Sequence, residues 1–181
     1  MDSPADFSAF DPATLARAVR TSSPLLLRFL GGFDESNRTT QAPGLPNHAA
    51  WTLGHLALTL HRAAERLDGS GLPERDFIAG AAAGDAERFG SESVAFGSRP
   101  VDEPGRYPSL ERSRAIFEGA VDRLANGIGT SSRERLAQSE PWGRAETTMG
   151  DLIVRMIVHN GTHAGQLADL RRALGMPPVI G

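Results

Sequence analysis

The stretch MGDLIVRMIVHNGTHAGQLADLRRALGMPP, residues 149–178, has the apolar periodicity of a long amphipathic helix. Thr148 and Asp151 form a pair that resembles a capping box just before the apolar run. Gly175 follows the last apolar position and is typical of a helix end. The pattern therefore predicts a helix over residues 148–174.

Two histidines, His159 and His163, lie four residues apart in this helix, and a helical wheel places both on its apolar face. Buried neutral imidazoles without partners are costly to desolvate, whereas a metal ion uses the i, i+4 spacing directly. Asn160 follows the first histidine, so the glutamate base of the zinc-protease motif is missing. Spacing alone leaves open whether the pair binds a metal or is bonded to other core groups.

Two glycines, Gly161 and Gly165, alternate with these histidines. Each costs about 1 kcal/mol relative to alanine inside a helix. We expect them to let a neighbouring helix or loop approach closely and to leave room for a metal ion and a substrate.

Three further segments have helical periodicity, over residues 11–31, 47–67 and 109–129. Residues 22–24, Ser-Ser-Pro, predict a kink or break in the first of them. No segment alternates convincingly with period two. The sequence therefore predicts an all-α fold, a four-helix bundle in which residues 1–181 form a single domain.

A forty-residue connection, residues 68–108, joins the second and third predicted helices and is rich in Gly, Ala and Pro. A connection this long is unusual in a compact domain, and it indicates a functional lid or a region with short elements of its own. The run DFIAGAAAGDAERF, residues 76–89, is compatible with a short helix.

The composition excludes several classes of site. The net charge of −3 argues against a nucleic-acid or anionic-membrane surface. With no cysteine, any metal must be bound by histidine and carboxylate, and the chain has no thiol nucleophile of its own. We find neither a signal peptide at the N-terminus nor an apolar run long enough for a membrane span, so we expect a cytoplasmic protein.

A metal site needs at least one more ligand, and the other three histidines all lie in the second predicted helix. His55 is in mid-helix among apolar neighbours and is the best candidate. His48 falls in the first turn, where we expect fraying, and His61 falls on another face, where we expect a solvated residue. This helix has two apolar faces, of which one faces the bundle and the other a lid or a second subunit.

Two segments together resemble the DinB/YfiT-like superfamily. They are WTLGHLALTLHRAAERLDG, residues 51–69, with a Trp-x-x-Gly-His motif, and residues 149–178, with the motif His-x-x-x-His-x-Gly-Gln-Leu. YPSLERSRAIF, residues 107–117, also resembles the start of the third helix of this family.

The resemblance implies a four-helix bundle in which His55, His159 and His163 hold a divalent metal ion, and it implies a homodimer. Characterised relatives include metal-dependent thiol S-transferases and a thiol-dependent isomerase. A fold transfers a reaction only weakly, and the family name implies no contact with nucleic acid.

Three imidazoles leave an open coordination position, as in catalytic metal sites. A metal there can activate water for hydrolysis or a small-molecule thiol for attack. Imidazole suits zinc, nickel, iron or copper, and manganese is also compatible; zinc and nickel are the metals we expect.

Three residues are candidates for a substrate pocket beside the metal. Gln166 lies next to the histidine pair on the helical wheel, and it either bonds a ligand or fills a polar gap. Trp51, one turn before His55, either forms a pocket wall or packs in the core, and His48 shares its face. No catalytic acid or base is assigned.

Three functions remain open at this stage. The first is an enzyme acting on a small molecule, with thiol S-transfer ahead of hydrolysis. The second is a non-catalytic binding or stress-response module, because no acidic residue lies within a turn of His159 or His163 on the ligand face. The third is a structural bundle with satisfied core histidines.

Overall fold

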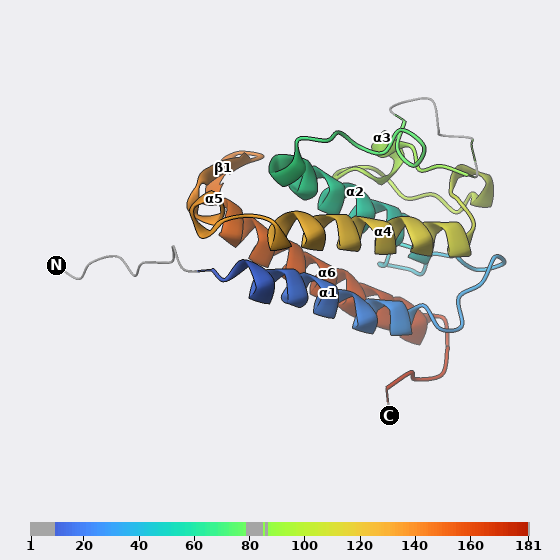
Figure 1. Ribbon diagram of the computed structural model, residues 1–181. Helices are drawn as coiled ribbons and strands as arrows, with labels where there is room; N and C mark the ends of the chain where they lie inside the picture. Colours follow the sequence, from blue (N-terminus) through green and yellow to red (C-terminus); the bar gives the residue numbers. More distant parts are fainter. Residues whose placement is uncertain (1–9, 79–84, 86, 181) are drawn as a thin grey trace.

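The computed structural model describes residues 10–78, 85 and 87–180, and four long helices dominate it (Figure 1). These helices are α1 (Pro12–Phe29), α2 (Ala49–Asp68), α4 (Leu110–Gly129) and α6 (Met149–Ala173). The all-α class is confirmed, and each helix lies within a few residues of its predicted bounds.

The four helices form a bundle in which α2 packs on α4, α4 on α1, and α1 on α6. Helices α2 and α6 run in opposite directions and face each other along a line that we call the α2/α6 seam (Figure 1). The caps of α6 match the sequence pattern, because the Thr148 side chain accepts from the Asp151 amide and Gly175 adopts a left-handed conformation with φ 70°.

Helix α1 continues through Pro24 without the predicted break. Proline has no N–H to donate to the carbonyl of Arg20, four residues earlier. The Ser23 hydroxyl donates to that carbonyl instead, across 3.0 Å. A local side-chain hydrogen bond therefore satisfies the group that proline leaves without its usual partner.

The long connection folds over the outer face of α2 and contains two short elements, α3 (Ser91–Val94) and the 3-10 helix η1 (Pro104–Arg106). Half of the segment in which a short helix was predicted, residues 76–89, lies outside the described residues. Near its two ends, Phe77 and Phe89 form an isolated parallel bridge and are buried. The connection thus covers the second apolar face of α2, whose burial requires no second subunit.

A small β-hairpin between α4 and α6 was not predicted. After the short helix α5 (Arg133–Ala137), strands β1 (Ser139–Trp142) and β2 (Ala145–Thr148) pair antiparallel. Gly143 in the turn has φ 64°, a conformation that glycine adopts without strain. Neither strand alternates apolar and polar residues, so the period-two signal of a strand is missing from both.

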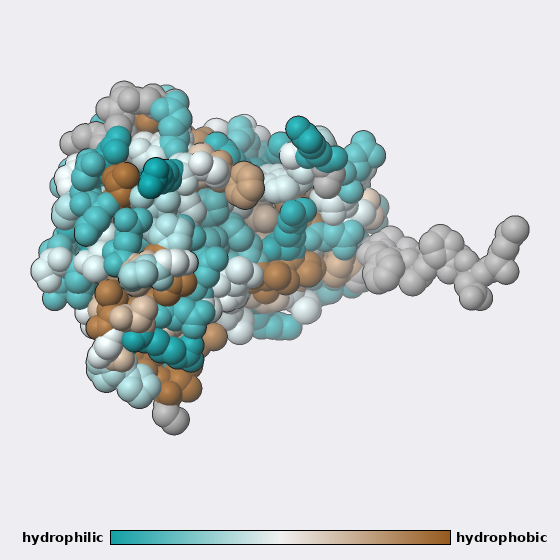
Figure 2. Space-filling view, turned by 180° about the vertical axis from the view of Figure 1, so that it is seen from behind, coloured by the Kyte–Doolittle hydropathy of each residue, from teal (hydrophilic) through white to brown (hydrophobic). Residues whose placement is uncertain are grey.

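Hydrophilic residues cover most of the face seen in Figure 2, and hydrophobic residues form separate patches on it. The large apolar side chains that remain exposed among the described residues are Leu25, Phe96, Val154, Val158 and Ile180. No described helix is both long enough and apolar enough to cross a membrane.

Candidate metal centre

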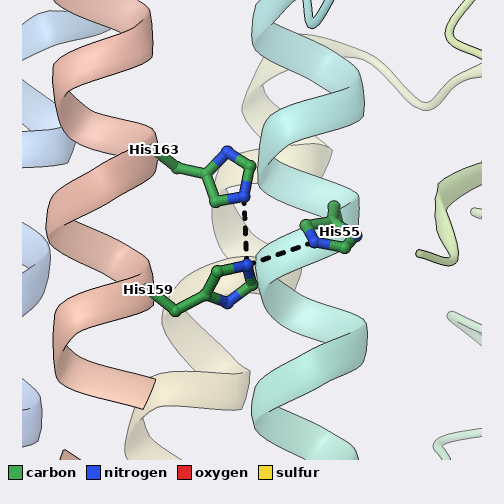
Figure 3. A group of neighbouring side chains, drawn as sticks. All are labelled: His55, His159 and His163. Atoms are coloured by element: carbon green, nitrogen blue, oxygen red, sulfur yellow. Dashed lines mark hydrogen bonds between the residues drawn. The ribbon is translucent and has the colours of Figure 1, made fainter. Parts of the chain in front are cut away.

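Three histidines converge on the α2/α6 seam: His55 from α2, and His159 and His163 from α6 (Figure 3). The Nε2 atom of His159 lies 3.2 Å from Nε2 of His55 and 3.1 Å from Nε2 of His163. Each of the three offers a ring nitrogen within 4.8 Å of the others. His55 and His163 each expose 6 % of their surface, whereas His159 is half-buried, so solvent reaches the group beside His159.

A hydrogen bond to the backbone sets the tautomer of His55. Its Nδ1 lies 2.7 Å from the carbonyl oxygen of Val94, at the end of α3. A carbonyl oxygen can only accept, so Nδ1 carries the proton and Nε2 presents a lone pair. Metal-binding histidines are oriented by hydrogen bonds of this kind from the second ring nitrogen.

Hydrogen bonding among the three rings alone leaves the group unsatisfied. His159 can donate one Nε2 proton, which the lone pair of His55 accepts. His163 must then also present a lone pair to that proton, with its own proton on Nδ1. This Nδ1 is buried and has no hydrogen-bond partner among the described residues. A cation at the centre removes the competition, because it accepts three lone pairs at once.

The donor spacing fits a metal ion. Nitrogens bound to one zinc ion at about 2.0–2.1 Å with tetrahedral angles lie about 3.3–3.4 Å apart. Two of the three separations, 3.2 Å from His159 to His55 and 3.1 Å from His159 to His163, differ from this by a few tenths of an ångström, and the third lies within 4.8 Å. His55, His159 and His163 are therefore compatible with one metal ion bound through Nε2.

Burial keeps the three imidazoles neutral. It lowers the pKa of His159 to about 4 and the pKa of His163 to about 3, and the other imidazoles of the group contribute to both shifts. Burial also lowers the pKa of His55. Neutral imidazole is the form that binds metals, so at neutral pH the group needs to release no proton before binding.

Comparison with protein families agrees with this geometry. The family model described as the DinB superfamily matches residues 18–167, which include all three histidines. The chain belongs to the DinB superfamily. No curated protein matches the sequence. Membership accounts for the helical fold and for a histidine group that can hold a metal ion, as the resemblance implied.

Trp51 stacks on His55 in this DinB chain, with ring centroids 4.5 Å apart and planes inclined by 8°. Its indole Nε1 donates to the Ser98 hydroxyl across 3.0 Å. Val94 and Ser98 lie in one short segment, so the long connection holds both His55 and the ring that packs against it. Sequence reasoning missed these two partners, because a backbone carbonyl and a loop serine carry no recognisable pattern.

Gly54, which precedes His55 in the Trp-x-x-Gly-His motif, allows the connection to approach α2. A Cβ atom at this position would lie 2.6 Å from the Phe89 ring and 2.9 Å from a Val94 methyl group. Both neighbours are fully buried. The glycine therefore lets the segment that bonds His55 pack directly on the helix. The Trp-x-x-Gly-His motif contains this glycine, but its packing role was not predicted.

The candidate pocket residues lie in different surroundings. His48 is not frayed: it is the fully buried N-cap of α2. Its Nδ1 accepts from the Trp51 amide and its Nε2 donates to the Val101 carbonyl, so backbone groups occupy both nitrogens. Gln166 is half-buried and accepts a hydrogen bond from Asn47 across 3.1 Å, which links α6 to the start of α2.

His61 is not a solvated residue, contrary to expectation. It is 4 % exposed, packs edge-on against Phe77, and lies 3.1 Å from the Arg123 guanidinium. Burial lowers its pKa to about 4. The long connection covers this face of α2, which a helical wheel of α2 alone does not reveal.

The expectation for Gly161 and Gly165 is wrong. Both are exposed, and a Cβ atom at either position would meet nothing within 4 Å. At about 100° per residue, both glycines lie on the side of α6 opposite the two histidines. They therefore leave no space around the metal centre, and the structure provides no packing reason for glycine there.

Proposed function

We propose that this DinB chain is a divalent-metal-dependent enzyme that transfers the sulfur of a small-molecule thiol to an electrophilic carbon. The observation that supports this most directly is the convergence of three neutral Nε2 atoms at a place that solvent reaches beside His159. Zinc or nickel suits three imidazole ligands. A divalent cation held there would supply a Lewis acid that lowers the pKa of a thiol or of water.

The residues around the group favour a thiol over water as the nucleophile. The metal-compatible group consists of histidines alone, and no carboxylate of the described chain belongs to it. Activation of water in zinc proteases relies on a glutamate base beside the ligands. A thiol is already close to ionisation at neutral pH and needs no such base.

The thiol must come from outside the protein, because the chain has no cysteine. In the proposed reaction the sulfur forms a bond to carbon, the leaving group departs with its bonding electron pair, and the thiol proton passes to solvent. His55, His159 and His163 hold the cation, and Trp51 and the Val94 carbonyl keep the His55 ring in place.

Two measurements test the proposal. Elemental analysis of the untagged protein is expected to give about one metal per chain, and His55→Ala or His163→Ala to abolish it. His61→Gln removes a buried imidazole outside the group and should leave the metal content unchanged.

The loaded protein is then assayed for consumption of small thiols in the presence of an alkylating electrophile. A rate that depends on both the metal and the histidines supports S-transfer. Full metal content without thiol consumption would contradict it and favour a hydrolase or a binding module. Absence of metal after incubation with zinc, nickel or manganese would remove the chemical basis of the proposal.

A further inference from the structure

Two arginines lie along the α2/α6 seam on the same side of the metal centre. Arg62 follows His55 by seven residues, about 10 Å along α2, and Arg155 precedes His159 by four, about 6 Å along α6. Because the two helices are antiparallel, both displacements point toward the same end of the bundle (Figure 1). On helical wheels Arg62 lies about 20° from His55 and Arg155 about 40° from His159.

Neither arginine has an anionic partner within the described chain. Both are exposed, and neither makes an ion pair with a described carboxylate. The acidic residues nearest along the helices are Glu65 and Asp151, and Asp151 is bonded to the Thr148 hydroxyl in the α6 cap. By contrast, Arg66 on the next turn of α2 pairs with Glu140.

No carboxylate of the described chain neutralises the positive charges of Arg62 and Arg155. Two cations on facing helices repel each other and make the potential along this part of the seam positive. An anion bound between them relieves the repulsion.

A hydrogen bond bridges the seam on the other side of the metal centre, where Asn47, just before α2, donates to Gln166 of α6. A molecule whose reactive atom lies at the three histidines and that extends along the seam past the half-buried His159, away from this bridge, comes to Arg155 and Arg62.

We propose that the substrate of this site is an anionic small molecule, whose carboxylate or other acidic group lies against Arg62 and Arg155 while its reactive atom lies at the histidines. This inference rests on the proposed function, because it takes the metal centre as the reactive end. It adds a charge requirement that the histidines alone do not impose.

Two thiols of equal chain length test the inference. The zinc-loaded full chain is titrated by calorimetry with mercaptohexanoate and with mercaptohexanol, whose six-carbon chains allow the far end to reach the arginines. The acid is expected to bind about five to ten times more tightly than the alcohol, the gain that two exposed charge contacts supply. Raising the salt concentration should reduce this preference, since exposed charges are screened.

Variants assign the preference to the two arginines. Arg62→Gln with Arg155→Gln should bring the ratio of the two affinities below about twofold, leaving zinc content and affinity for the alcohol unchanged. Arg62→Lys with Arg155→Lys should keep most of the preference. Arg17→Gln with Arg114→Gln changes the net charge equally on α1 and α4, and should leave the ratio as in the unmodified chain.

Each contrary result has a separate meaning. Equal affinity for both thiols in the zinc-loaded chain would overturn the anionic substrate and leave the metal-thiol proposal standing. A preference that survives in the double glutamine variant would overturn the assignment to Arg62 and Arg155. Binding of neither thiol to the zinc-loaded chain would overturn the proposed function and this inference together.

Discussion

His55 donates a hydrogen bond from Nδ1 to the carbonyl oxygen of Val94 across 2.7 Å, and this contact determines which nitrogen of the ring faces His159. The acceptor lies thirty-nine residues away in sequence, in the connection that crosses α2. The metal centre therefore depends on how that connection packs, although the connection supplies none of the three histidines.

The close approach at Gly54 gives the first prediction. Gly54→Ala should lower the free energy of unfolding by about 1–2 kcal/mol, because overpacking against Phe89 and Val94 outweighs the better helix propensity of alanine. Displacing Val94 should also weaken zinc binding about tenfold or more, as loss of such orienting bonds does in other metal sites. Urea unfolding and competition with a zinc chelator measure the two effects.

Gly161→Ala is the matched control on the histidine-bearing helix. The added Cβ atom has no neighbour within 4 Å. We therefore expect the free energy of unfolding to rise by up to about 1 kcal/mol and the zinc affinity to stay unchanged. Equal zinc affinity in Gly54→Ala and the unmodified chain would show that Val94 does not orient His55 as proposed.

Metal removal gives the second prediction. A metal that binds only the folded chain stabilises it by about 2.7 kcal/mol when the free metal exceeds the dissociation constant a hundredfold. For a chain of this size that corresponds to a rise in Tm of about 5–10 °C, lost on addition of chelator. His163→Ala should show no such rise, whereas His61→Gln should keep it. A Tm that is indifferent to zinc and chelator would favour a structural role for the three histidines.

Acid sensitivity gives the third prediction. The pKa values of His48 and His61 are about 4 in the folded chain, and histidine in an unfolded chain has its ordinary pKa of about 6.5. Well above pH 6.5 both residues are neutral in the folded and in the unfolded chain. Their contribution to the free energy of unfolding is then fully present. As the pH falls from 6.5 to 4, the unfolded chain takes up protons that the folded chain does not, so the free energy of unfolding decreases.

The decrease in the free energy of unfolding on acidification has an upper limit of about 3 kcal/mol for each of these two histidines. Urea unfolding between pH 7 and pH 4.5, with chelator present, measures it. His61→Gln should show a smaller decrease over this range than the unmodified chain. The same pH dependence in both proteins would mean that His61 is not held neutral by its surroundings.

The continuity of α1 gives the fourth prediction. Ser23→Ala should cost about 1 kcal/mol, because it leaves the Arg20 carbonyl without the hydroxyl that replaces the missing N–H of Pro24. In a Pro24→Ala background the amide of residue 24 can donate to that carbonyl, so the cost should largely disappear. Chemical unfolding of the two single variants and the double variant measures this coupling. Equal costs in both backgrounds would refute the explanation.

Much of the bundle follows from local signals. Periodicity places His159 and His163 on one face of α6, and Thr148 and Gly175 mark its ends, because helix formation depends on residues only three or four positions apart. A helical wheel of α6 also places Gly161 on the side opposite the histidines. The expectation that this glycine leaves room for a metal ion was therefore wrong. Pro24 shows that one side-chain hydrogen bond can reverse a local expectation.

Other features depend on packing between segments distant in sequence. The rotation of α2 against α6 brings His55 to His159, and the folding of the long connection over α2 buries His61 and brings the Val94 carbonyl to His55. Contacts of this kind are set by the shapes of whole helix faces and by the path of a loop, not by spacing along the chain. Residue types and helix faces are local properties, whereas the distances that make three histidines a metal centre arise only when those faces meet.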